Sequence, residues 1–207
     1  MAVITSYSTL LTEVATWLAR SNLTSAIPGF VQNFEEKFFR QPKNYGPWMH
    51  SSFNISFSST ATVPSDYLTH KIAYLNGQSD QPLKPASLEQ LLTMYPRTSS
   101  GQPKWMARDG TTFVFGPAPS GTYTLNGTYF AKPTVLRSFA ADAAAHWLVV
   151  NAPDLLLYGS LLEAQPYLMN DKRLMVWQGF FDKALMDYRD LMKAQNVSGG
   201  SMQVLVA

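Results

Sequence analysis

The sequence predicts an α+β fold, a helical bundle formed by N- and C-terminal helices with a β-rich insertion between them. At both ends of the chain apolar residues recur every three or four positions, which is the period of an amphipathic helix. Between Trp48 and Pro133 they alternate with polar residues, and turn-forming residues become frequent, as is typical of strands. The predicted regions are the N-terminal helices at 1–44, the β-rich insertion at 45–133, the C-terminal helices at 134–195 and a C-terminal tail at 196–207.

Two helices are expected in the N-terminal region. The first covers residues 8–20, with Ser8 as the expected N-cap because a serine hydroxyl can accept a hydrogen bond from the first turn. The second opens at Ser25 with Pro28 in its first turn, where a missing N–H does no harm. Pro42 stops it.

Turn residues divide the middle of the chain into short strands. The pairs Asn76-Gly77 and Asp109-Gly110 favour tight turns, because both central residues of a type I′ turn have positive φ. We therefore expect a hairpin with a type I′ turn at Asp109-Gly110. Residues 87–94 interrupt the strands with a short helix capped by its first serine.

The C-terminal region carries the strongest helical pattern. Asn151 is the expected N-cap of a helix with Pro153 in its first turn, and Pro166 kinks or ends that helix. Asn170 or Asp171 caps the next helix, whose apolar residues repeat at alternating steps of three and four and suit packing along a neighbouring helix. This seam, within residues 172–195, includes Leu174, Trp177, Phe181, Tyr188 and Leu191.

Composition narrows the classes of function. The 207 residues are 46% apolar, enough for a sizeable core, and only 14% charged, which hints at surface covered in an oligomer. The 16 basic and 14 acidic residues are scattered, so a dedicated nucleic-acid-binding protein is not expected. Cysteine is absent, which excludes disulfides, thiolate metal sites and a cysteine nucleophile. No signal peptide or membrane span is recognisable, and a soluble, unexported protein is expected.

Motifs for catalysis or cofactor binding are not visible. The three histidines, His50, His70 and His146, lie far apart and outside any metal-site spacing. Asp142 and His146 are one helical turn apart, but no third ligand has a matching spacing, so a structural pair is the preferred interpretation. The sequence therefore predicts no catalytic residue, no metal ligand and no cofactor.

The last residues form a short apolar tail. Met202, Val204, Leu205 and Val206 follow a glycine pair, and an apolar segment of this kind is either disordered or docked on a partner. The pattern alone leaves both alternatives open.

Several segments resemble head-to-tail adaptor (connector) proteins of short-tailed, podovirus-type bacteriophages. The most specific is NAPDLLLYGSLLEAQPYLMNDKR at 151–173, and the similarity extends in order over nearly the whole chain to about residue 192. The other matching segments are ATWLARSNLTSAIPGFVQNFE at 15–35, TVPSDYL at 62–68, AYLNG at 73–77, SLEQL at 87–91, DGTTFVFGPAPSGTYTLNGTYFAK at 109–132 and HWLVVNAPDL at 146–155.

The resemblance implies a structural virion protein and no enzyme. Such adaptors form a ring, usually of twelve copies, between the portal protein and the tail nozzle (tail tubular) protein, and genomic DNA passes through the lumen without specific binding. The chain would be assembled in the host cytoplasm and reside in the neck of the particle, with no membrane and no cofactor. On this basis the seam from Leu174 to Leu191 packs in the bundle or against the next subunit, and Met202, Val204, Leu205 and Val206 bind the portal.

The residues also leave two alternatives from other functional classes. A virion-associated hydrolase would use carboxylates and the Asp142–His146 pair. A glycan-binding tail protein would use an aromatic platform made by Tyr123, Tyr129 and Phe130.

Overall fold

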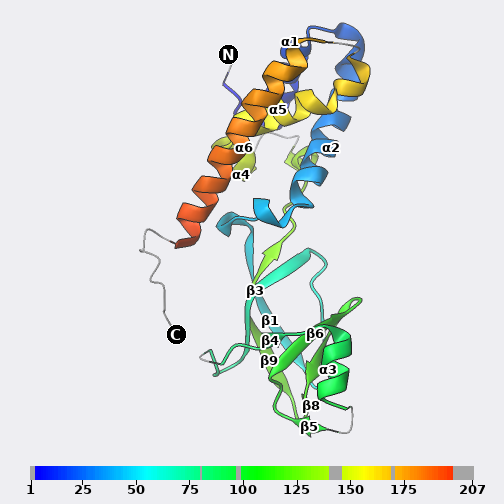
Figure 1. Cartoon of the computed structure of the whole chain (residues 1–207), viewed down its shortest axis with the longest axis vertical. Coiled ribbons are helices and arrows are strands. Elements are labelled where there is room, and N and C mark those ends of the chain that lie inside the picture. Colours follow the sequence, from blue (N-terminus) through cyan, green and yellow to red (C-terminus); the bar gives the residue numbers. More distant parts are fainter. Residues whose placement is uncertain (1–2, 80, 97–98, 140–145, 169–170, 198–207) are drawn as a thin grey trace. The chain divides into compact units, whose positions relative to one another are not determined.

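The computed structural model of the chain describes residues 3–79, 81–96, 99–139, 146–168 and 171–197. Its contacts group into two units, coloured along the sequence in Figure 1. The helical unit comprises Met1–Trp48 and Thr134–Ala207, and the β unit comprises Met49–Pro133. The fold is mixed α and β, as the sequence predicts.

The N-terminal part of the helical unit begins with α1 (Tyr7–Leu18). Ser6 caps this helix instead of Ser8, because its hydroxyl accepts from the Thr9 N–H while the Thr9 hydroxyl accepts from the Ser6 N–H, a reciprocal capping box. A 3₁₀-helix contains Ser25, so the second helix begins at Ile27 and not at Ser25. Pro28 lies in its first turn, as expected. The following elements are η1 (Ser21–Ala26), α2 (Ile27–Phe39), η2 (Pro42–Asn44) and η3 (Pro47–Met49).

In the C-terminal part of the helical unit, one predicted N-cap is wrong. Asn151 ends α4 and donates its side-chain N–H to the Trp147 carbonyl, so it does not cap the next helix, which starts directly at Pro153. Pro166 lies in a 3₁₀ turn just after that helix ends, as predicted. Asp171 accepts a hydrogen bond from the Arg173 N–H at the start of the last helix, whereas Asn170 lies outside the described residues. The elements are η4 (Leu136–Phe139), α4 (Trp147–Asn151), α5 (Pro153–Glu163), η5 (Gln165–Tyr167) and α6 (Arg173–Val197).

The core of the helical unit is built around α5. This helix contacts α1, α2 and α6, and every residue from Leu155 to Leu161 is buried. A helix that is apolar all round is expected to be enclosed by its neighbours. Figure 1 shows α5 in yellow between the other helices of this unit.

The described residues of the β unit form three small sheets and one helix. A three-stranded antiparallel sheet has the order β1-β9-β3, a four-stranded sheet has the order β2-β7-β6-β4, and β5 pairs with β8. Within the four-stranded sheet β4 runs parallel to β6. The elements are β1 (His50–Phe57), β2 (Thr60–Thr62), β3 (Tyr67–Leu75), β4 (Lys84–Pro85), α3 (Leu88–Met94), β5 (Ser100–Gly101), β6 (Trp105–Asp109), β7 (Thr112–Gly116), β8 (Ala118–Pro119) and β9 (Tyr123–Ala131).

The alternation of side chains along each strand explains how the core of the β unit forms. Phe53 and Phe57 point to the same face of β1 and are 3% and 4% exposed. Phe57 stacks on Phe115 of β7, with ring centroids 4.1 Å apart, so the aromatic residues join the two larger sheets. The apolar and polar residues of this strand therefore lie on a buried and an exposed face.

The hairpin between β6 and β7 is present, but its turn differs from the prediction. Asp109 pairs with Thr112, so the central turn residues are Gly110 and Thr111. Gly110 has φ +57°, whereas no non-glycine residue of the β unit that the structure describes has positive φ. This pattern belongs to a type II′ turn, which needs a glycine only at its first central position. Ser87 caps α3 through a capping box with Gln90, as predicted.

Candidate interaction surfaces

One face of α6 carries the predicted seam. Trp177 and Tyr188 are 2% and 3% exposed, whereas Leu174 and Phe181 are half-buried. The seam packs on α2, where Phe181 meets Phe34 at 5.7 Å and Tyr188 meets Phe38 at 5.2 Å between ring centroids. Leu191 is 41% exposed, and the adjacent Met192 takes the buried position at 3%. The seam therefore lies against the helical unit as far as Tyr188 and then continues through Met192.

The start of α6 is fixed to the end of α1 by one arginine. Arg173 donates from Nη1 to the Trp17 carbonyl at 2.9 Å and from Nη2 to the Leu18 carbonyl at 3.3 Å, carbonyls that the helix itself leaves unpaired. It also forms a salt bridge with Asp171 at 2.6 Å. The hydrogen bonds from Arg173 lower the pKa of Asp171 to about 2.

The opposite side of α6 carries two exposed methionines among charged residues such as Asp182 and Lys183. Met175 and Met186 are 85% and 65% exposed, and at 3.6 residues per turn they lie within about 20° of each other on the side away from Trp177. The remaining members lie on the flank between these two positions and the buried seam. We name this set the α6 outer surface; it consists of Met175, Val176, Phe180, Met186 and Leu191.

The flank of this surface is supported from beneath. The Phe180 ring packs on Tyr158 of α5 at 5.2 Å, and Tyr158 in turn meets the edge of Trp17 at 5.7 Å. Phe180 nevertheless remains 45% exposed. Several large apolar side chains of this one helix are thus exposed.

Comparison with known proteins decides the class of the molecule. A family model described as SU10 adaptor protein matches residues 5–204, nearly the whole chain. The chain belongs to the SU10 adaptor protein family. The adaptor is thus a structural bacteriophage protein, and the resemblance to phage head-to-tail adaptors is confirmed. No curated protein matches the adaptor.

The apolar residues of the C-terminal tail, Met202, Val204, Leu205 and Val206, lie outside the described ranges. Asp142 of the Asp142–His146 pair also lies outside them, whereas His146 is described.

The three histidines lie in different surroundings. His146 caps α4 by accepting a hydrogen bond from the Leu148 N–H at 3.3 Å, and burial lowers its pKa to about 4. His70 contacts the Tyr67 hydroxyl at 3.1 Å, while His50 lies edge-on to Phe130 at 4.9 Å. Among residues with described positions, no three His, Cys, Asp or Glu side chains form a group that could hold a metal ion.

The aromatic residues of the predicted glycan platform do not form one exposed surface. Tyr129 is 5% exposed, stacks near Phe53 at 4.7 Å and donates its hydroxyl to Asp66 at 3.0 Å. Tyr123 and Phe130 are half-buried. Tyr129 is therefore a core residue of the β unit. Separately, none of the helices in the described ranges is long and apolar enough to cross a membrane.

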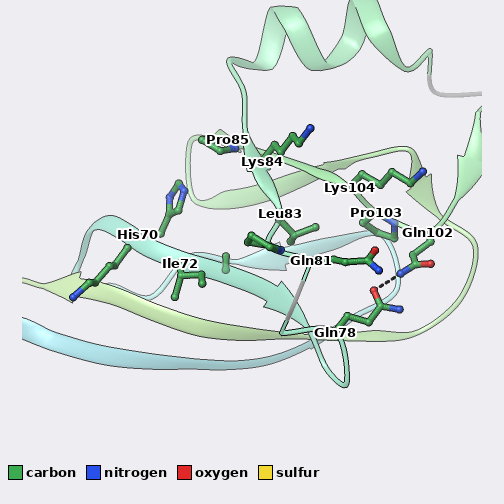
Figure 2. A pocket seen from close by; sticks show the side chains of 13 residues that line it. His70, Ile72, Gln78, Gln81, Leu83, Lys84, Pro85, Gln102, Pro103 and Lys104 are labelled. Carbon is green, nitrogen blue, oxygen red and sulfur yellow. Dashed lines mark hydrogen bonds between the residues drawn. The ribbon is translucent and has the colours of Figure 1, made fainter. Parts of the chain in front are cut away.

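Each unit also contains a pocket that no local sequence pattern predicts. In the helical unit a groove of about 370 Å³ lies between α2, α5 and α6, with the Lys37–Glu163 salt bridge of 2.7 Å at its rim. In the β unit a pocket of about 670 Å³ is lined by residues of β3, β4 and the segment before β6 (Figure 2). Its lining residues are separated by up to 34 positions in sequence, and short-range patterns do not reveal such a site.

Proposed function

We propose that the adaptor forms a ring, of about twelve copies as the resemblance implies, between the portal protein and the tail nozzle protein, with genomic DNA passing through the lumen. The helices from both chain ends form the bundle that carries the ring contacts. Support comes from the family match over residues 5–204 and from the low content of charged residues, 14%. A net charge of +2 without basic clusters suits a channel that does not hold DNA phosphates.

The α6 outer surface is the observation that carries this proposal. Trp177 and Tyr188 already pack one side of α6 within the subunit, so Met175 and Met186 on the other side are left for a contact between subunits. Burying such side chains contributes about 1.5–3 kcal/mol each relative to leaving them in water. In a closed ring every subunit repeats this contact.

The C-terminal tail is the proposed contact with the portal. The proposal rests on its composition, because Met202, Val204, Leu205 and Val206 are apolar, follow a glycine pair and are unfavourable to leave in water. A truncated protein that lacks residues 197–207 is expected to keep its fold and lose portal binding. Normal portal binding by the truncated protein would contradict this role.

The first experiment mixes the purified adaptor with assembled portal rings and measures mass by light scattering and symmetry by particle imaging. A second ring added to the portal is the expected result. Absence of any association across a range of salt concentrations would contradict the adaptor ring.

The second experiment changes the α6 outer surface without damaging the helix. Met186→Lys removes the apolar contact and places a cation four residues from both Asp182 and Asp190 and three residues from both Lys183 and Arg189, so the charges on the helix roughly balance. For Met186→Lys we expect an unchanged far-ultraviolet circular dichroism spectrum and loss of ring formation on the portal. Met186→Leu, which keeps an apolar side chain, is the matched control and retains ring formation. If both variants form rings equally well, Met186 does not take part in the contact between subunits.

A further inference from the structure

The groove of the helical unit has an apolar floor and a polar rim. Phe34 and Phe38 of α2 are 5% and 3% exposed, and Phe181 of α6 is half-buried beside them. The salt bridge between Lys37 and Glu163 lies at the rim. An apolar centre surrounded by polar groups is the usual anatomy of a protein–protein interface, and a groove of about 370 Å³ has room for a large side chain of a partner.

An exposed stripe of α6 lies on the side away from this groove. Its members recur at steps of four, three and four residues, which places them on one face of the helix. At 3.6 residues per turn, Gln178 and Leu185 of the groove lie about 140–160° around α6 from Phe180, which is 45% exposed. One side of α6 therefore presents an aromatic side chain and the other side lines a recess. We name this stripe the α6 flank; it consists of Val176, Phe180, Lys183 and Asp187.

Ring symmetry requires two such surfaces. In a closed ring each subunit contacts the next one through one surface and the previous one through a different surface. The groove and the α6 flank meet this requirement, because they face different sides of the same helix. In a ring of about twelve copies, neighbouring subunits are related by a rotation of about 30°, so their α6 helices run within about 30° of parallel.

This alignment also brings opposite charges together. With Phe180 of one subunit beside Phe181 of the next, Asp187 reaches the level of Arg189, because seven and eight residues span about 10–12 Å of helix. Arg189 donates to neutral side-chain amides of the groove lining, and it forms no salt bridge within the described part of the chain. Asp187 is exposed and has no basic partner among the residues with described positions. The two charges are therefore complementary across the contact.

We propose that the groove between α2, α5 and α6 receives the α6 flank of a neighbouring copy of the adaptor, with Phe180 on the apolar floor and Asp187 paired with Arg189. The inference rests on the proposed ring and deepens it by naming the two surfaces that meet. A second copy is the occupant, because the matching aromatic and acidic side chains lie on the same helix that lines the groove.

Cross-linking between two cysteine variants tests the contact. The natural chain contains no cysteine, so each variant has a single thiol. Lys183→Cys places it on the α6 flank and Gln165→Cys places it at the groove, both at exposed positions. The two full-length variants are mixed, assembled on portal rings and treated with a short bismaleimide. We expect adaptor dimers from the mixture and none from either variant alone, since the contact joins two unlike surfaces.

Imaging of the same samples separates this contact from the ring itself. Rings on the portal without dimers from the mixture, or dimers from a single variant, would overturn the contact and leave the proposed ring intact. Absence of rings with the unmodified protein would contradict the proposed function, and the contact with it.

A change of charge on the α6 flank gives an independent measurement. Asp187→Lys is expected to raise the adaptor concentration needed for half-maximal ring formation on the portal by about tenfold or more. Asp109→Lys makes the same change of charge at an exposed position of the β unit and is expected to alter that concentration by less than about twofold. Equal effects of the two variants would overturn the pairing, because net charge would then account for both.

Discussion

Arg189 of α6 donates two hydrogen bonds to the side-chain oxygen of Asn44, from Nε at 3.0 Å and from Nη2 at 2.9 Å. Asn44 is 1% exposed, and its side-chain N–H₂ donates to the Phe38 carbonyl at 2.9 Å. The main-chain carbonyl of Asn44 accepts a hydrogen bond from the Tyr188 hydroxyl at 2.7 Å. One amide therefore joins the end of α2 to the middle of α6.

Asn44→Ala is expected to lower the free energy of unfolding by about 2–4 kcal/mol, because it leaves the buried Phe38 carbonyl and the Arg189 guanidinium without this partner. Chemical denaturation of the purified protein measures the change. Asn33→Ala, at an exposed position of α2, is the control and changes the free energy of unfolding by less than about 0.5 kcal/mol. Equal effects of the two variants would show that the hydrogen bonds of Asn44 contribute nothing net.

Replacing glycine by alanine is expected to have opposite effects on stability at two positions of the helical unit. A Cβ added at Gly159 would lie 2.3 Å from a ring carbon of Phe34, so Gly159→Ala forces α2 and α5 apart and is expected to cost about 1–3 kcal/mol. A Cβ at Gly179 of α6 meets nothing within 4 Å, and Gly179→Ala is expected to stabilise the helix by up to about 1 kcal/mol. Thermal unfolding of both variants measures whether each substitution raises or lowers the stability. A stabilised Gly159→Ala protein would mean that α2 yields to the methyl group at no cost.

The Ser87 cap of α3 is expected to contribute about 1 kcal/mol to stability, because Ser87→Ala leaves the Gln90 N–H without its hydroxyl acceptor at 3.2 Å. Denaturant unfolding measures the loss. Ser87→Asp, which keeps an acceptor at the cap, is the matched control and restores stability. If the aspartate variant is as unstable as the alanine variant, the hydroxyl does not act as a cap.

Periodicity predicted the elements well because burial on one face repeats along each of them. Phe53, Ile55 and Phe57 illustrate this for a strand, since Phe53 and Phe57 are buried and Ile55 packs partly against the same core. The N-cap of α1 is harder to predict, because Ser6 and Ser8 are both residue types that cap helices. The choice depends on Thr9, which stands three residues after Ser6 and completes the capping box.

Contacts between distant segments could not be predicted from local patterns. The heptad pattern of α6 points to Leu191, yet Met192 is buried, because a straight helix of 3.6 residues per turn drifts from a repeat of 3.5. Gly46 makes room for it, since a Cβ there would lie 2.0 Å from the Met192 sulfur. The β-unit pocket depends on the approach of Leu83 to Ala73 in the same way.

The stability of the adaptor is expected to fall in mild acid through His146. Burial lowers the pKa of His146 to about 4, below its ordinary value of 6.5. The unfolded chain therefore takes up a proton at pH values where the folded protein does not, so this contribution is complete above about pH 6.5 and is lost as the pH falls towards about 4. The difference between these two pKa values corresponds to about 3 kcal/mol of unfolding free energy.

His146→Asn isolates this contribution, because asparagine can also accept the Leu148 N–H at the start of α4 and does not titrate. Between pH 7 and pH 4 the unmodified protein is expected to lose about 3 kcal/mol more of its unfolding free energy than the variant, measured by urea denaturation at each pH. Carboxylates titrate in both proteins and cancel in the difference. The variant is expected to be less stable at neutral pH, since the smaller side chain loses the contact of His146 with Trp48 at 5.7 Å, but that offset does not depend on pH. Parallel pH profiles of the two proteins would show that His146 is protonated in the folded state as readily as in the unfolded chain.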